Sequence, residues 1–209
     1  RPLQAGATLG VLALLVAGIW VWRKPAVDDN SAQKPKPVAA QAADYVGSEA
    51  CGSCHKVEFA EWRQSQHAKA MQHADPSSVL GQFNNVGFEY NGITSRFFMK
   101  DGKYMVNTDG PDGEMTDFEI SYTFGLDPMQ QYLIAFPDGR MQALSIAWDT
   151  RPTEQGGQRW FHLQPDEKVD FKDPLHWTKR TQNWNFMCAD CHSTDVRKNY
   201  DQASNSFKT

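Results

Sequence analysis

The chain has 209 residues, which is enough for one or two domains. Its formal net charge of −4 is mild and argues against nucleic acid as a partner. The sequence starts at Arg1 and stops at Thr209 in a polar stretch, so we expect it to be part of a longer protein.

Residues 3–22 contain no charged side chain, and a membrane-spanning helix needs about 20 apolar residues. Two tryptophans near the end of this run are followed by Arg23 and Lys24, which is typical of an interfacial anchor. The alternative is a cleaved signal peptide, whose apolar core usually has about 7–15 residues. We favour an uncleaved transmembrane helix within residues 1–24.

Residues 25–46 read as a linker, rich in Pro, Ala, Gln, Lys and Asp. Pro35 and Pro37 favour an extended, semi-rigid tether, and the segment has too few apolar groups to join a core. We therefore predict that one folded module begins near residue 47 and continues to residue 209.

A five-residue pattern, C-x-x-C-H, occurs at residues 51–55 (the first motif) and 188–192 (the second motif). The two motifs use all four cysteines of the chain. This pattern is typical of covalent c-type haem attachment, in which two thiols form thioethers to one porphyrin and the histidine becomes the proximal ligand of the iron. The sequence thus predicts two haems c, bound by Cys51, Cys54 and His55 and by Cys188, Cys191 and His192.

Paired cysteines also occur in zinc sites, in redox dithiols and in disulfides. Zinc sites built from two C-x-x-C pairs usually space them by about 15–20 residues, whereas residues 56–187 separate the motifs here. A redox dithiol needs one C-x-x-C and no following histidine. A pair of disulfides would not require the histidines either. Haem attachment explains the whole pattern.

The segment after the first motif has the spacing of a helix over residues 48–74, ending before Asp75-Pro76. On this helix His67 lies among small and soft residues, where a flat macrocycle could approach, and His73 points elsewhere. We predict that His67 is a distal haem ligand; the alternative is an ordinary surface or core histidine.

A straight helix constrains which haem His67 can reach. It would separate His55 from His67 by about 18 Å along its axis, so the two rings could not flank one iron. No Gly or Pro interrupts residues 56–74. We therefore expect His67 to bind a neighbouring haem, either the one on His192 or one beyond Thr209.

Residues 83–148 change period and read as a β insert. Asn-Gly or Asp-Gly pairs at residues 91–92, 101–102 and 138–139 separate apolar stretches, a strong hairpin signal. Residues 118–124 alternate apolar and polar side chains, as in a strand with one buried face. We predict about five or six short antiparallel strands, with the many aromatic residues in the core of the sheet.

Residues 149–209 are interrupted by several Pro and Gly residues and are predicted to be mostly irregular. His162 and His176 lie near the second motif in sequence, and either could reach an iron or serve as a structural histidine. Met71 and Met187 are further candidate axial ligands, although methionine is commonly core filler.

Two stretches resemble a known family. The run WRQSQHAKAM at residues 62–71 is similar to the segment after a C-x-x-C-H in multihaem cytochromes of the cytochrome c554 type, and NWNFMCADCHST at residues 183–194 resembles a second haem segment of that group. The resemblance covers roughly residues 45–205. It implies an electron-transfer module with mainly bis-histidine haems, in which His67 and His176 match distal ligands. Such relatives usually carry more than two haems, whereas this sequence has two motifs.

The sequence therefore predicts an α+β protein: a transmembrane helix, a linker, and a multihaem cytochrome c module with short helices and an antiparallel β insert. Because c-type attachment occurs outside the cytoplasm, we expect it on the periplasmic side of a bacterial inner membrane. The expected partners are redox donor and acceptor proteins, the membrane, and further haems or domains. An alternative function is part of a multihaem oxidoreductase that acts on a small nitrogen or sulfur compound at an open iron.

Overall fold

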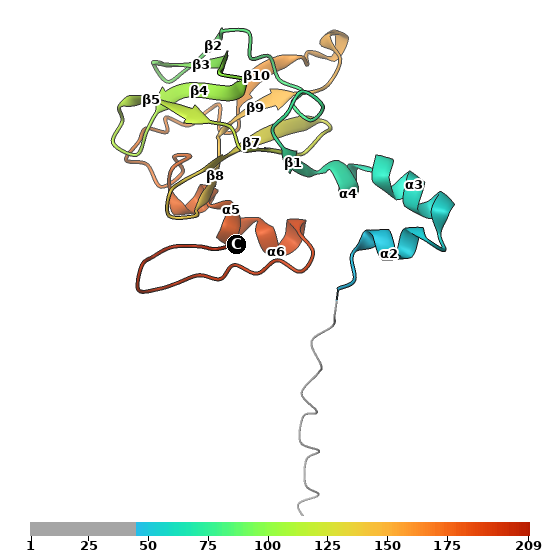
Figure 1. The fold of residues 1–209 in the computed structure, drawn as a ribbon. Coiled ribbons are helices and arrows are strands. Elements are labelled where there is room, and N and C mark those ends of the chain that lie inside the picture. Colours follow the sequence, from blue (N-terminus) through green and yellow to red (C-terminus); the bar gives the residue numbers. More distant parts are fainter. Residues whose placement is uncertain (1–44) are drawn as a thin grey trace, which may run out of the picture. The chain divides into compact units, whose positions relative to one another are not determined.

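A computed structural model describes residues 45–209 (Figure 1). The predicted membrane helix and nearly all of the predicted linker lie outside the described residues. Within residues 45–209, no helix is both long enough and apolar enough to span a bilayer. The described part is α+β, with antiparallel sheets and a few short helices, as the sequence predicts.

The first sheet is a meander of four antiparallel strands in chain order: β2 (Val86–Tyr90), β3 (Ile93–Lys100), β4 (Lys103–Asp109) and β5 (Met115–Glu119). The turns that join its first three strands place Asn91-Gly92 and Asp101-Gly102 at positive φ. Glycine accepts that conformation freely and Asn or Asp tolerates it, which is why these pairs form two-residue hairpins. These two hairpin predictions are confirmed, and so is the third, because residues 129–135 and 141–143 pair antiparallel around residues 138–139.

The second sheet has six strands. Its order is β1-β6-β7-β9-β10, and β8 pairs with β7. The strands are β1 (Met71–His73), β6 (Tyr122–Phe124), β7 (Met129–Ala135), β8 (Met141–Ala143), β9 (Ile146–Asp149) and β10 (Arg159–His162). The predicted number of about five or six strands was too low. Eight strands, β2 to β9, begin within residues 83–148, because several of them are short; β1 and β10 lie outside that range.

The alternating stretch 118–124 is not one strand. The backbone N–H of Ile120 donates to Tyr104 in the first sheet, whereas that of Ser121 donates to Leu133 in the second. The chain passes from one sheet to the other between these two residues. Apolar and polar residue types keep alternating in the sequence through the crossing, so the pattern alone could not reveal it.

The two sheets share one core, which lies between them. Phe97 on β3 stacks on Trp160 of β10 with ring centroids 3.6 Å apart, and Phe83 meets both rings edge-on. Burying each large apolar side chain contributes about 1.5–3 kcal/mol. The prediction that the aromatic residues form the core of the sheet is confirmed.

The helices are short and lie outside this core: α2 (Ser48–Gly52), α3 (Lys56–Gln64), α4 (Gln66–Lys69), α5 (Trp184–Met187) and α6 (Ala189–His192), with 3-10 turns η1 (Thr153–Gln155) and η2 (Arg180–Gln182). The prediction of one helix over residues 48–74 is wrong. Ser65 is extended, and its hydroxyl donates to the Trp62 carbonyl at 2.6 Å and accepts from the Ala68 N–H at 3.3 Å. Serine thereby ends α3 and caps α4.

Candidate haem-binding site

Both C-x-x-C-H motifs fold into the same helical turn. The carbonyl of Cys51 accepts from the N–H of Cys54 at 3.2 Å and of His55 at 2.9 Å. The carbonyl of Cys188 accepts from Cys191 at 3.2 Å and from His192 at 3.0 Å. Such a turn places the two cysteines of a motif, three positions apart, on one face of the chain, with the imidazole beside them.

All four thiols are free. Cys51, Cys54 and Cys191 are exposed, and Cys188 is half-buried. Burial raises the pKa of the Cys188 thiol, which keeps it protonated at neutral pH. Residues 45–209 contain no group of three or more His, Cys, Asp or Glu side chains arranged for a metal ion.

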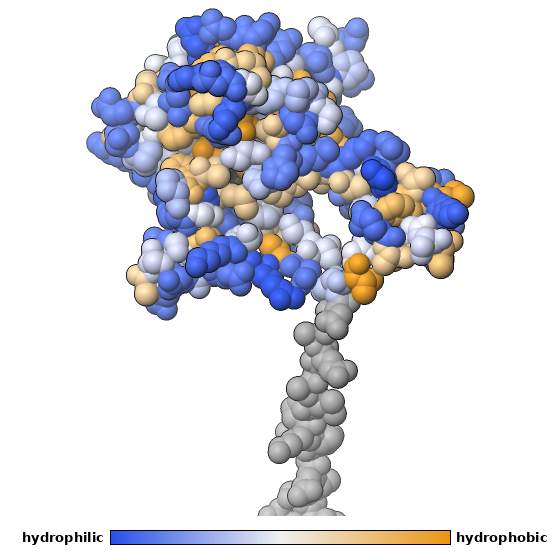
Figure 2. Space-filling model, viewed as in Figure 1, coloured by the Kyte–Doolittle hydropathy of each residue, from blue (hydrophilic) through white to orange (hydrophobic). Residues whose placement is uncertain are grey.

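The first motif sits on a pair of helices with no core of their own. Neither α2 nor α3 has a buried residue, and Val57 and Trp62 are exposed. Figure 2 shows apolar side chains on the surface of this segment. The two helices meet at Gly52, where an added Cβ would lie 2.6 Å from the Phe59 ring. Two thiols, an imidazole and uncovered apolar groups suit a large apolar macrocycle, so these residues fit haem c.

The second motif is held by the two sheets and their shared core, residues 71–162, together with the loops packed on them, which we call the β domain. Ala189, fully buried, packs with Leu133, Ala143 and Trp184. The buried side chain of Asn185 accepts from the N–H of Met141 at 2.7 Å, which ties α5 to β8.

A second asparagine reinforces this attachment. The side chain of Asn183 accepts from Phe186 N–H at 3.0 Å as the N-cap of α5 and donates to Gln142 Oε1 at 3.0 Å. Sequence reasoning did not assign either asparagine a role. An asparagine before a short helix is a capping signal that could have identified Asn183.

Three of the six histidines of the chain line one cavity of about 390 Å³, which we call the histidine cavity. They are His67 on α4, His73 on β1 and His192 at the end of α6. The His73 ring lies 4.6 Å from that of Tyr122, and the His192 ring lies 5.1 Å from that of Phe124. His55 is not among the lining residues.

Two predictions about this region need correction. His73 does not point away from His67, because residues 71–73 form strand β1, paired with β6, instead of continuing a helix. The straight-helix separation of His55 and His67 does not apply either, since the chain bends at Ser65. The structure nevertheless brings His67 to the cavity that His192 lines. Met71 also lines this cavity, and Met187 is exposed.

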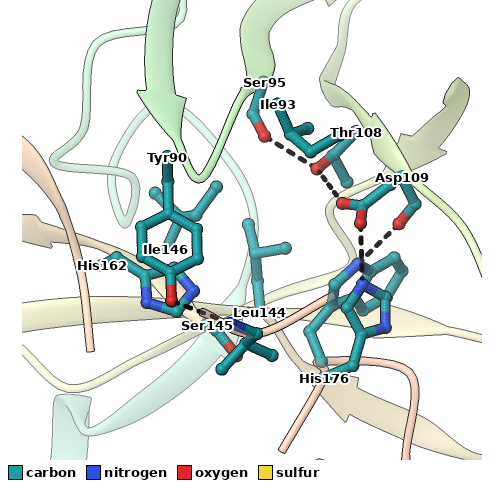
Figure 3. Close-up of a pocket in the computed structure, with 12 residues that line it drawn as sticks. Tyr90, Ile93, Ser95, Thr108, Asp109, Leu144, Ser145, Ile146, His162 and His176 are labelled. Carbon is teal, nitrogen blue, oxygen red and sulfur yellow. Dashed lines mark hydrogen bonds and ion pairs between the residues drawn. The ribbon is translucent and has the colours of Figure 1, made fainter. Parts of the chain in front are cut away.

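The other two candidate ligands lie inside the β domain, around a small cavity of about 30 Å³ (Figure 3). His176 is buried; its Nε2 lies 3.1 Å from Asp109 Oδ2, and its Nδ1 lies 2.9 Å from Thr178 Oγ1. Both ring nitrogens are engaged, so in this arrangement His176 has none free to bind iron. The structure does not place this predicted ligand at either motif.

His162 is buried as well and stacks on Tyr90 with ring centroids 3.5 Å apart. Its Nδ1 accepts from the N–H of Gln164 at 3.1 Å. Burial lowers the pKa of His162, so the ring is neutral at pH 7. These contacts give His162 a structural place in the sheet.

Two helical C-x-x-C-H turns, each with two free thiols next to a histidine, are the arrangement that c-type cytochromes use to bind haem c covalently. The comparison with protein families gives the same class: residues 50–86 match the family described as cytochrome c554 and c-prime. This match contains the first motif, α3 and α4, and it agrees with the resemblance to cytochromes of the c554 type at residues 62–71. No curated protein and no solved structure matches the chain.

Proposed function

We propose that this c-type cytochrome carries electrons through two haems, one on each motif. The observation that carries the proposal is the identical helical turn in both motifs, each with two free thiols beside a histidine. In each motif the cysteines would hold the porphyrin edge and His55 or His192 would be the proximal ligand. Bound haem supplies a one-electron iron couple. A redox titration of the holoprotein followed by its absorbance tests this, with two one-electron components expected.

The second haem takes its distal ligand from the first haem segment. His67 and His192 line the same cavity, although residues 68–191 separate them in sequence. Two imidazoles that flank one iron saturate it, which suits electron transfer rather than binding of a substrate. The same sheet holds the elements that carry both histidines. Strand β1, which follows α4, pairs with β6, and Ala189 of α6 packs on β7 and β8.

His67→Ala tests this ligation in a chain whose first motif is disabled by Cys51→Ala and Cys54→Ala, so that one haem dominates the spectrum. We expect that haem to change from low-spin to high-spin. His73→Ala in the same background is the matched control, since His73 lines the same cavity. If His73→Ala alone produces the high-spin form, His73 is the ligand and the assignment of His67 is wrong.

A second candidate function follows from the placement of the histidines. Of the six in the chain, three line the histidine cavity, two are buried in the β domain, and His55 is apart from both groups. No second histidine of the described residues is placed beside His55. This arrangement favours an open iron on the first haem, as in an oxidoreductase for a small nitrogen or sulfur compound. A spectral shift of that haem with cyanide or nitrite would support catalysis, and its absence would support the carrier.

The proposed location is the periplasmic face of a bacterial inner membrane, with redox proteins and further haems as partners. Support comes from the length of the uncharged run at residues 3–22 and from the attachment of haem c outside the cytoplasm. Membrane fractionation and N-terminal sequencing of the full-length protein test it. A soluble mature form that begins near residue 41 or 43 would show that the run is a signal peptide.

A further inference from the structure

A second large cavity, of about 400 Å³, shares no lining residue with the histidine cavity. Its walls come from β8, η2, α5 and the loop that follows α6, which returns beneath α5 (Figure 1). Its lining includes Arg140, Arg180, Phe186, Tyr200, Asn205 and Phe207. We call it the arginine cavity. Its volume falls in the range of about 300–1,000 Å³ that is usual for small-molecule sites.

The loop wall is fastened to the β domain. Phe207 N–H donates to the carbonyl of Asp138 at 2.8 Å, and the Asn185 amide donates to Thr209 Oγ1 at 2.7 Å. Gly139 has a φ of +80° and faces the Phe207 carbonyl, with which any Cβ would collide. Glycine is thus needed for the loop to come this close. These contacts hold one wall of the cavity in place.

Two guanidinium groups from different elements line this cavity. Arg140 donates from Nε to Asp138 Oδ2 at 2.6 Å and lies 5.0 Å above the Phe136 ring. This contact neutralises part of its charge but leaves the two Nη groups available. Arg180 makes no ion pair within residues 45–209, and its Cζ lies 5.7 Å above the Phe186 ring. None of the described lining residues is Asp or Glu.

The remaining walls are aromatic and amide. The rings of Phe186, Tyr200 and Phe207 lie with their centroids 4.9–5.6 Å apart. The Tyr200 hydroxyl donates to Asn205 Oδ1 at 2.9 Å, which leaves the Asn205 amide as a donor. The Gln142 amide is not available to a ligand as a donor, because it donates to two backbone carbonyls. The lining residues therefore present hydrogen-bond donors, aromatic surface and positive charge to the cavity. Asp138, which pairs with Arg140, is not among them.

We propose that the arginine cavity binds a carboxylate. The guanidinium group is planar and matches carboxylate geometry with two parallel hydrogen bonds, while the aromatic walls would cover an apolar body. Two sources supply this chemistry. One is a free small organic acid. The other is a propionate of the second haem, since Phe186 lies two residues before Cys188; this source rests on the function proposed above.

The test uses the holoprotein and its Arg180→Gln variant, with benzoate as the probe and benzamide as its neutral analogue. Arg159→Gln is the matched control, because Arg159 is exposed on β10 and donates to the Gly156 carbonyl away from this cavity. If a free acid is the ligand, benzoate binds and benzamide does not, as measured by calorimetry. Arg180→Gln then weakens benzoate binding by about tenfold or more, the loss expected for charge-assisted hydrogen bonds.

If the haem propionate occupies the cavity, benzoate does not bind to the wild-type protein. Arg180→Gln then shifts the midpoint potential of the second haem to a more negative value, because a positive charge that favours the reduced state is lost, and Arg159→Gln does not. Circular dichroism of each variant confirms that the fold is retained. Equal binding of benzoate and benzamide, or identical behaviour of the Arg180 and Arg159 variants in both assays, overturns the proposal. Haem loading is measured separately, so failure of the proposed function is distinguished from failure of the carboxylate site.

Discussion

His176→Phe should destabilise the β domain without changing either haem. In the structure a continuous chain of hydrogen bonds runs from Ser95 through Thr108 and Asp109 to His176 (Figure 3). It continues from His176 to Thr178. Phenylalanine preserves the size of the ring but removes both nitrogens. Asp109 then loses one of its two side-chain hydrogen-bond partners, and the buried Thr178 hydroxyl loses a partner as well.

The size of the effect follows from these two losses. A hydrogen bond to a charged group contributes about 1.5–3 kcal/mol, and an unsatisfied buried polar group costs about 1–3 kcal/mol. The side chain of Asp109 is 13% exposed, so water compensates part of the first loss. We expect the free energy of unfolding to fall by about 2–4 kcal/mol in total.

Denaturant unfolding of the holoprotein measures this change, and the visible spectrum is recorded on the same samples. Asp117→Asn is the control, because its ion pair with Lys100 is exposed and such pairs contribute little. A loss below about 0.5 kcal/mol would refute the structural role of His176. A haem that turns high-spin would show instead that His176 is an iron ligand, as the family resemblance implies.

Three further changes have defined outcomes. Burial alone would raise the pKa of Asp109, but its hydrogen bond and charge interaction with His176 outweigh burial and hold the pKa below its ordinary value. The resulting stabilisation is complete above the unfolded pKa of about 3.9 and is lost as the pH falls through the lower folded pKa, so acid unfolding of Asp109→Asn should depend less on pH below about 4. Tyr132→Phe leaves the Gly81 N–H without its 3.0 Å acceptor and should reduce the unfolding free energy by about 1–3 kcal/mol, measured with denaturant. Ser65→Ala removes the cap of the short helix that carries the predicted distal histidine, so about 1 kcal/mol of helix stability should be lost and the second haem should show more high-spin signal.

Local patterns predicted the parts of this protein whose chemistry is local. The attachment motifs are complete within five residues each, and the Asn-Gly and Asp-Gly pairs carry the positive φ that their hairpins require. The aromatic content of residues 83–148 correctly indicated a buried sheet core. The family resemblance at residues 62–71 was confirmed by the comparison over residues 50–86.

The errors share a physical cause, which is pairing between distant residues. Residues 71–73 have a helical pattern, but their ladder with β6 makes them a strand. His176 resembles a free ligand in sequence, and its acceptor Asp109 lies on β4, far away in the chain. The histidine cavity likewise forms only because β1 lies next to β6 and α6 packs on β7 and β8. The spacing of residues within one segment cannot predict contacts between segments that are distant in sequence.

The central claim, two covalently bound haems, is tested most directly by the intact mass of the denatured protein after expression with a haem-attachment system. The account predicts the added mass of two haems in the wild-type chain. It predicts one in the variant with Cys51 and Cys54 both changed to alanine, and one in the variant with Cys188 and Cys191 both changed to alanine. A wild-type protein whose haem is extracted by acid–acetone, or that retains one haem in its denatured form, would contradict it.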